Sequence, residues 1–207
     1  MVLTREQEIF TLLHKEYDGT GSALKFGSVY QLLIAVILSA QTNDNQVNKI
    51  TEKLFKNYGT PENLAKIKLA ELEQLIKTCG LYKNKAKNIL AASKIILEQY
   101  KGEVPKTREE LMLLPGVGRK TANVVLSVGY GIPALAVDTH VFRLAHRLGF
   151  SNGKNPEQVE ADLCAIIPEK DWAEAHHWLI WHGREVCTAQ KPKCDMCIVQ
   201  QLCEYKV

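Results

Sequence analysis

Apolar residues recur at helical spacing along most of the chain. Two successive segments carry them: Leu64, Ile67, Leu72, Leu75 and Ile76, then Ala86, Ile89, Leu90, Ile96, Leu97 and Tyr100. Spacings of three and four residues place such side chains on one face of a helix. No segment shows the convincing alternation of apolar and polar residues that is typical of a half-buried strand. The pattern predicts an all-α protein.

Residues that are typical of helix ends lie at the boundaries of the predicted helices. Side chains that cap helices, and prolines that fit a first turn, predict the starts. Glycines predict the ends. The candidate starts are Thr60 with Pro61, Thr107 with Glu110 as a capping box, and Asp171 with Glu174, and the candidate ends are Gly80 and Gly102.

The composition is that of an ordinary globular protein. The chain has 207 residues, of which 46% are hydrophobic and 24% charged, which excludes disordered, collagen-like and low-complexity chains. This length allows one domain or two small ones. Helix breakers concentrate at Gly129, Gly131 and Pro133, so residues 129–133 are the best candidate boundary. The formal net charge of +3 is too small to indicate a polyanionic partner by itself.

The N-terminal segment contains no long apolar run. Residues 1–19 carry charges throughout, unlike a secretory signal peptide. A long uncharged stretch, residues 121–137, contains several helix breakers and is shorter than a membrane span. We therefore expect a cytoplasmic protein. In that compartment thiols stay reduced, and clustered cysteines are metal ligands before they are disulfides.

Six cysteines are the one unusual feature of the composition. Cys79 and Cys164 stand alone on predicted helical segments, and we expect both in the core. The other four crowd near the C-terminus, separated by six, two and five residues: Cys187, Cys194, Cys197 and Cys203. Zinc sites usually pair two short knuckles, whereas one close pair flanked by wider spacings favours a [4Fe–4S] cluster. Zinc, or no metal at all, are the alternatives.

A glycine-rich turn joins two predicted helices, over residues 108–114 and 119–127. Residues 114–123 read LPGVGRKTAN. Gly116 and Gly118 lack a Cβ, so their backbone N–H groups can approach a phosphate closely, beside the N-terminus of the next helix. Such a contact holds a nucleic-acid backbone without reading bases. A tight helix–helix connection with conformational glycines is the alternative explanation.

Two charged residues accompany this turn. Lys120 lies in the first turn of the second helix, and Asp138 begins another predicted helix in VDTHVFRLAHRLG, residues 137–149. Taken singly, each has an ordinary explanation. A lysine beside a turn is usually a solvated charge, and an aspartate before Thr139 is a good N-cap.

The combination of these motifs resembles the endonuclease III family of helix–hairpin–helix DNA glycosylases. The resemblance spans nearly the whole chain. It is carried by the four-cysteine spacing together with LLIAVILSAQ (32–41), GLYKNKA (80–86), LPGVGRKTANVVL (114–126), VDTH (137–140) and HHWLIWHGR (176–184).

The resemblance implies an all-α protein of two lobes. Residues 22–132 are expected to form a six-helix barrel domain that contains the hairpin, and residues 1–21 with 133–207 an iron–sulfur domain. The implied partner is double-stranded DNA with a damaged or abasic nucleotide, which is flipped into the cleft between the lobes. We accordingly expect the protein to be a monomer that is associated with the nucleoid and binds a [4Fe–4S] cluster.

The resemblance also implies roles for single residues. Lys120 attacks C1′ of a damaged pyrimidine nucleotide, Asp138 assists, and β-elimination through a Schiff base cuts the strand on the 3′ side. Leu81 wedges into the duplex, and Gln41 fills the gap left by the flipped base. Other implied DNA contacts are Gly116, Val117, Gly118, Arg119, Thr121 and Lys191, while Asp44 and His140 lie near the pocket and Cys187, Cys194, Cys197 and Cys203 bind the cluster.

A local excess of positive charge accompanies the proposed wedge. Residues 81–106 contain two glutamates and six lysines, Lys83, Lys85, Lys87, Lys94, Lys101 and Lys106. We expect this window to meet phosphates, with a merely solvated helix face as the alternative.

Two other functions compete with a bifunctional glycosylase and lyase. One is a monofunctional mismatch glycosylase of the same superfamily, which lacks the catalytic lysine and carries a long C-terminal domain. Lys120 and the short segment after Cys203 count against it. The other is a non-catalytic DNA-binding module with a structural zinc site. A brown chromophore and strand nicking without added metal distinguish the enzyme from this module.

Overall fold

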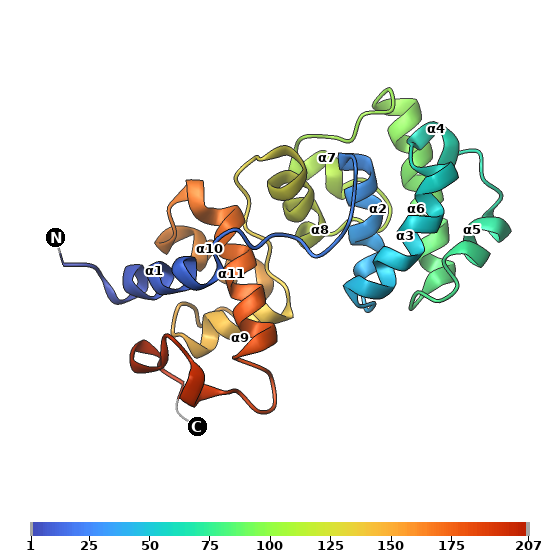
Figure 1. Ribbon diagram of the computed structural model, residues 1–207. Coiled ribbons are helices and arrows are strands. Elements are labelled where there is room, and N and C mark those ends of the chain that lie inside the picture. The colour runs from blue at the N-terminus through green and yellow to red at the C-terminus, as the bar shows by residue number, and fades with distance from the viewer. Residues whose placement is uncertain (1, 206–207) are drawn as a thin grey trace. The chain divides into compact units, whose positions relative to one another are not determined.

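The computed structural model describes residues 2–205 and contains no strand among them, so the all-α prediction is confirmed (Figure 1). The chain divides into two compact units, Ser22–Ile132 and the combination of Met1–Gly21 with Pro133–Val207. None of the helices in the described part of the chain is long and apolar enough to cross a membrane.

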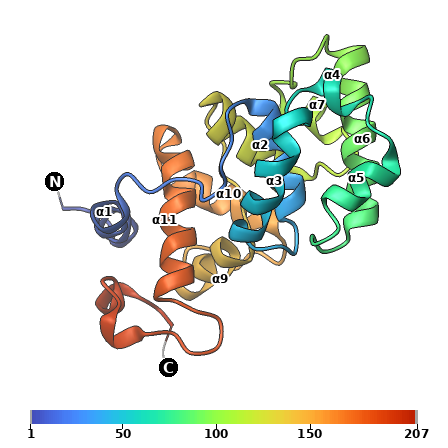
Figure 2. The same ribbon diagram turned by 45° about the vertical axis from the view of Figure 1, so that its right-hand side comes forward.

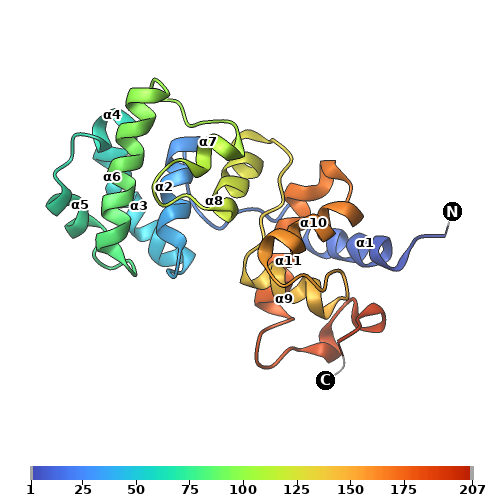
Figure 3. The same ribbon diagram turned by 180° about the vertical axis from the view of Figure 1, so that it is seen from behind.

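The unit Ser22–Ile132 is built around a buried apolar helix. Every residue from Leu32 to Leu38 is buried, as expected of a helix that is hydrophobic on all sides. This helix, α2, packs against α3, α6, α8 and the π-helical turn η1 (Figure 3). The helices of the unit are α2 (Val29–Ser39), α3 (Asp44–Tyr58), α4 (Pro61–Leu64), α5 (Leu69–Leu75), α6 (Tyr82–Gln99), α7 (Arg108–Met112), α8 (Arg119–Val124) and η1 (Val125–Gly129).

Two helical segments of this unit differ from the prediction. The segment from Leu64 to Ile76 is two short helices, because the chain turns between α4 and α5, and Cys79 lies in a turn after α5 rather than on a helix. The predicted helix 119–127 is α-helical only to Val124 and continues as the π turn η1. That turn ends at Gly129, where a Cβ would lie 3.0 Å from the Val29 side chain.

The second unit brings the first helix of the chain together with the last ones. Its central helix, α11, packs against α1 and α9 (Figure 2). Ile9 and Leu13 of α1, Val141 and Leu144 of α9 and Leu179 of α11 are fully buried in one core. The helices are α1 (Arg5–Tyr17), α9 (Thr139–Arg147), α10 (Pro156–Ile166) and α11 (Trp172–Glu185), with 3-10 turns at η2 (Glu169–Asp171), η3 (Cys194–Met196) and η4 (Gln200–Leu202).

The predicted helix starts have mixed outcomes. Thr60 and Thr107 both accept a backbone hydrogen bond as N-caps. The capping box at Thr107 is incomplete, because the Glu110 carboxylate accepts from the Thr107 hydroxyl at 2.7 Å. The helix start predicted at Asp171 is confirmed, because α11 begins at Trp172, but the predicted cap is not formed. Asp171 makes no side-chain cap bond, because the 3-10 turn η2 leads into the helix and leaves Asp171 with helical torsion angles.

Candidate functional site

The two glycines of the hairpin differ in what the protein requires of them. Gly116 has φ 82°, a conformation that favours glycine, and a Cβ there would lie 3.0 Å from Asn88 Cβ. Gly118 has φ −96°, and a Cβ there would meet nothing within 4 Å. The turn itself therefore requires glycine at 116 only. At 118 the absence of a side chain leaves bare backbone open to a ligand.

The rest of the hairpin is anchored by one apolar side chain. Val117 is buried, and its N–H donates to the Leu114 carbonyl at 3.1 Å. Arg119, Lys120 and Thr121 follow in the first turn of α8, all three partly exposed. The structure thus presents Lys120 at the surface of the unit, beside the exposed backbone of Gly118.

Gln41 and Leu81, predicted to enter the duplex, are exposed and lie on adjacent loops. Their φ values are 56° and 57°, in the left-handed region that costs a residue other than glycine about 1–3 kcal/mol. Leu81 is 59% exposed, although it is a large apolar residue. The Gly80 N–H donates to Thr42 Oγ1 at 3.2 Å, which joins the two loops. Asp44 lies partly exposed at the start of α3, two residues after Thr42.

Asp138 is the N-cap of α9, as its position in the sequence predicts. Its Oδ1 accepts hydrogen bonds from the backbone N–H groups of His140 and Val141, both at 2.8 Å. The preceding segment is held by His176, a buried residue whose Nδ1 lies 2.7 Å from the Ala136 carbonyl oxygen. Sequence reasoning assigned His176 no role, although it lies within the motif HHWLIWHGR. His140 is partly exposed, with Nδ1 3.2 Å from Arg143 Nη2.

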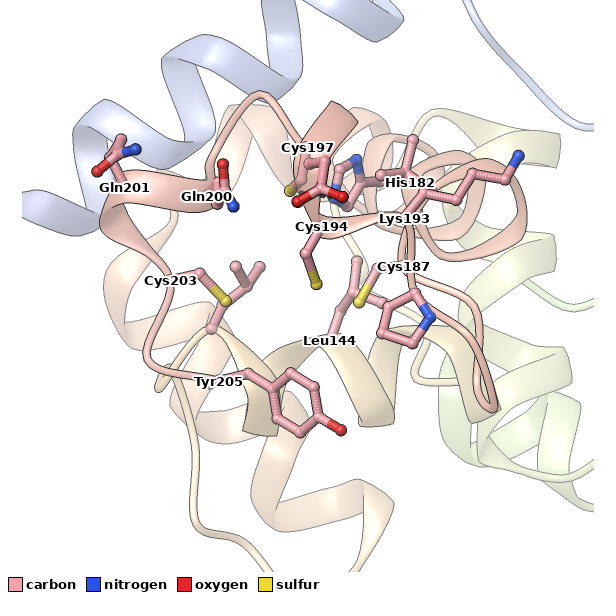
Figure 4. A pocket seen from close by; sticks show the side chains of 14 residues that line it. Leu144, His182, Cys187, Lys193, Cys194, Cys197, Gln200, Gln201, Cys203 and Tyr205 are labelled. Carbon is pink, nitrogen blue, oxygen red and sulfur yellow. Dashed lines mark hydrogen bonds between the residues drawn. The ribbon is translucent and has the colours of Figure 1, made fainter. Parts of the chain in front are cut away.

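The four C-terminal cysteines surround one cavity of about 390 Å³ (Figure 4). All four are half-buried free thiols. Figure 4 shows the sulfur atoms of Cys187, Cys194 and Cys203 turned toward a common space, with Cys197 beside His182. Among residues 2–205, no three side chains of His, Cys, Asp or Glu are placed to hold a single metal ion. Four cysteine thiols around one cavity are the ligand set of an iron–sulfur cluster, which is larger than a single metal ion.

The surroundings of the thiols disfavour the thiolate form unless positive charge lies in the cavity. Burial raises the pKa of the Cys197 thiol, the backbone N–H of Val199 lowers it, and the neighbouring cysteines raise it, with a net shift upward. Cluster ligands must be thiolates, so the charge of the iron would have to offset this upward shift. Next to Cys197, burial lowers the pKa of His182 to about 4 and raises the pKa of Tyr17 to about 12. His182 Nδ1 and Tyr17 Oη are 3.1 Å apart, so this neutral pair adds no charge.

Two arginines of α9 hold the first part of the cysteine loop. Arg143 donates to the carbonyl oxygens of Gly183 and Cys187, at 2.8 and 2.9 Å from Nη2. One turn later, Arg147 donates to Cys187 Sγ at 3.3 Å and to the Thr188 carbonyl at 2.8 Å. The helix that begins at Asp138 is therefore fastened to the loop that carries the first cysteine. Lys191 lies exposed further along the same loop.

The expected basic surface loses one of its six lysines. Lys85 is only 5% exposed, and its Nζ donates to the carbonyl oxygens of Leu38 and Ala40. The prediction that Lys85 meets phosphates is therefore wrong, because its ammonium group is buried against the carbonyl oxygens at the end of α2. The other five lysines of residues 81–106 are exposed.

Known proteins match the chain over almost all of its length. The HhH-GPD superfamily of base excision DNA repair proteins matches residues 34–169, and the iron–sulfur binding domain of endonuclease III matches residues 187–203. Endonuclease III of Escherichia coli (strain K12) is 49% identical over 96% of this chain and 94% of that protein. Endonuclease III of Bacillus subtilis (strain 168) is 52% identical over 84% of this chain and 80% of that protein.

Comparison with solved structures leads to the same family. The structure of a trapped endonuclease III–DNA covalent intermediate aligns with a TM-score of 0.92 at 47% identity. The alignment covers 98% of this chain and 97% of that one.

Proposed function

Because the chain belongs to the HhH-GPD superfamily and, within it, to the endonuclease III family, we propose that Lys120 and Asp138 perform its reaction. The protein is a bifunctional DNA glycosylase and AP lyase of base excision repair, which binds DNA and a [4Fe–4S] cluster. The observation that carries the assignment is the near full-length match to an endonuclease III trapped covalently on DNA, in a chain that has a lysine in the hairpin helix.

The proposed substrate is duplex DNA with an oxidised pyrimidine or an abasic site, bound by one copy of the chain. The Lys120 amine attacks C1′ of the damaged nucleotide, and the base leaves with a proton. The sugar ring then opens at the C1′–O4′ bond, with O4′ protonated, and the resulting Schiff base allows loss of a proton from C2′ and rupture of the 3′ C–O bond. A free lysine has a pKa of about 10.4, so full activation at pH 7 requires about 4 kcal/mol from its surroundings in the complex.

Asp138 is proposed to act through its carboxylate charge. As the base departs, positive charge develops at the sugar, and a nearby carboxylate stabilises it and accepts a proton from the lysine. Both backbone hydrogen bonds reach Oδ1, which leaves Oδ2 as the oxygen for this role.

Asp138→Asn separates catalysis from capping. An asparagine side chain also accepts backbone N–H bonds at an N-cap, so we expect Tm to stay within about 2 °C of the wild-type value. The lost charge lowers single-turnover base removal by about a hundredfold. Stopped assays on a thymine glycol duplex measure the rate, and Asp138→Ala is the comparison that loses cap and charge together. Equal rates for Asp138→Asn and wild type contradict the catalytic role.

The hairpin residues Gly116, Val117 and Gly118 are proposed to hold the DNA backbone, chiefly through the exposed backbone at Gly118, with Arg119, Thr121 and Lys191 as further contacts. Gly118→Ala adds a methyl group to open space, so we expect an unchanged Tm and DNA binding weakened by about tenfold. Gly116→Ala adds backbone strain and a close contact, so its Tm falls by several degrees. Binding titrations and melting curves compare the two. Full DNA affinity in Gly118→Ala contradicts the backbone contact.

The cluster ligands are proposed to be Cys187, Cys194, Cys197 and Cys203. When bound, the cluster supplies a redox-active and strongly cross-linking group, and no bond of the substrate is made or broken there. Its effect on DNA binding is to shape the loop that carries Lys191, which the Thr188 hydroxyl also supports by donating to the Lys191 carbonyl at 2.7 Å.

Residues 22–132 are assigned to a six-helix barrel domain and residues 1–21 with 133–207 to an iron–sulfur domain. We further propose that Asp44 and His140 lie near the bound nucleotide. The iron–sulfur match disfavours a zinc-bearing, non-catalytic module, and Lys120 disfavours a monofunctional mismatch glycosylase.

Borohydride trapping tests the activity. The purified protein is mixed with a duplex that contains thymine glycol and with matched duplexes that contain an oxidised purine or a mismatch. We expect a covalent adduct and strand cleavage on the pyrimidine lesion without added metal. A protein that removes the base but yields neither an adduct nor a nick is a monofunctional glycosylase.

A further inference from the structure

A buried lysine lies beneath the two loops that carry Gln41 and Leu81. Lys85, on α6, donates from Nζ to the carbonyl oxygens of Leu38 at 2.8 Å and Ala40 at 2.5 Å. These carbonyls are at the C-terminal end of α2, where a cation is favourable and where helix carbonyls lack partners within the helix. Burying a lysine costs free energy unless its N–H donors form hydrogen bonds. The Leu38 and Ala40 carbonyls must therefore stay within bonding distance of Lys85 Nζ, which constrains the backbone at the end of α2.

Two further side chains complete the arrangement. Thr42 Oγ1 lies 3.3 Å from Lys85 Nζ and accepts from the Gly80 N–H at 3.2 Å. Cys79 Sγ lies 3.1 Å from Lys85 Nζ and 3.1 Å from Thr42 Oγ1, and it donates to the Leu38 carbonyl at 3.2 Å. We call Thr42, Cys79 and Lys85 the Lys85 cluster. It bonds both loops to the end of α2 and to each other.

The cluster contacts the residues directly before and after the two exposed side chains. Gln41 lies between Ala40, a partner of Lys85, and Thr42, a member of the cluster. Leu81 follows Gly80, whose N–H bonds to Thr42. Gln41 and Leu81 are two of only three residues other than glycine with positive φ among residues 2–205. Such conformations persist when the surrounding structure over-determines them.

We propose that the Lys85 cluster is a positioning device, which holds Gln41 and Leu81 in left-handed conformations so that both side chains are preset to enter the DNA duplex. The inference rests on the proposed function in one respect, that these two residues insert into DNA. Lys85, Thr42 and Cys79 act through them and do not touch the reacting atoms. Preset loops avoid an ordering cost at binding and keep the flipped nucleotide in reacting geometry.

Thr42→Val is the principal test. Valine keeps the shape of threonine but removes the oxygen that accepts from Gly80 and faces Lys85 and Cys79. Single-turnover trapping is measured on an abasic site in a duplex and on the same abasic oligonucleotide as a single strand, which needs no wedge. We expect the duplex rate to fall about tenfold and the single-strand rate to stay within about twofold. Leu81→Ala and Gln41→Ala should show the same pattern.

Ser93→Ala is the matched control on α6. It also removes one buried hydroxyl, which bonds to Tyr30 at 2.6 Å and to the Ile89 carbonyl at 2.7 Å, away from both loops. Its ratio of duplex to single-strand rate should equal that of wild type. The ratio is measured within one preparation, so a loss of folded protein cancels. A wild-type ratio in Thr42→Val overturns the proposal.

Lys85 itself supplies a second test. Lys85→Met should reproduce the Thr42→Val pattern, and Lys85→Arg, which restores donors to the α2 carbonyls, should recover part of the duplex rate. If arginine recovers none while both variants melt at the same temperature, the positioning role is overturned. Failure of the proposed function has a different signature, because the wild-type protein itself would then form no adduct on either substrate.

Discussion

Replacement of Lys120 by glutamine abolishes borohydride trapping and lowers strand cleavage at an abasic site by at least about a thousandfold. Glutamine keeps a polar side chain of similar reach in the first turn of α8 but has no amine to form the Schiff base. Because Lys120 is partly exposed, we expect Tm to change by no more than about 2 °C. The loss therefore reports on the nucleophile and not on folding.

The measurement is denaturing electrophoresis of the trapped adduct at several time points, with melting curves of each variant. Lys154→Gln is the matched control, because it removes an exposed lysine of the other unit that has no proposed part in the reaction. It should trap DNA as wild type does. A Lys120→Gln protein that traps DNA at the control rate shows that another amine is the nucleophile.

Replacement of Cys194 by alanine removes the cluster and destabilises the unit that contains it. Binding of a structural metal contributes directly to folding, so we expect a loss of at least about 3 kcal/mol and a fall in Tm of about 10 °C. The residues from Cys187 to Cys203 form only short 3-10 turns, and Cys194 lines the central cavity. Besides the cluster, this segment is held by hydrogen bonds from Arg143 and Arg147 of α9 and by the buried side chain of Val199.

Iron and sulfide analysis, visible absorption and calorimetry measure the effect. Cys164→Ala is the control, since Cys164 lies on α10 and does not line the cavity. It should keep its iron, its colour and a Tm near that of wild type. A colourless wild-type protein with stoichiometric zinc contradicts the cluster, as does full iron content in Cys194→Ala.

Loss of the cluster is also expected to weaken catalysis indirectly within the same unit. The loop after Cys187 is held by Arg143 and Arg147 of α9, and Asp138 is the N-cap of that helix. A disordered loop leaves Arg147 without its carbonyl partners and leaves Arg143 with the Gly183 carbonyl of α11 but without that of Cys187. In Cys194→Ala we therefore expect base removal to be impaired even where DNA is still bound.

The sequence alone predicts the features that depend on neighbouring residues. Helical spacing of apolar residues, the glycines of the hairpin and the cap at Asp138 follow from backbone geometry over a few positions, and the structure contains each of them. The four-cysteine spacing likewise limits the kind of metal site, because the ligands lie within one short segment. These signals were sufficient for the fold class, and they favoured an iron–sulfur cluster, which the family match over residues 187–203 supports.

The tertiary structure decided where side chains from distant segments meet. Lys85 counts as one more surface charge in the sequence, yet packing of α6 against the end of α2 buries it. Gly116 and Gly118 look alike in the sequence, and the structure distinguishes them by the positive φ of Gly116 and by its close approach to Asn88. Burial and contacts across the fold determine the free energy of a polar group, and neither is encoded in local spacing. The positioning of Gln41 beside Leu81 is therefore a property of the folded protein, since the residues that hold them come from different helices and turns.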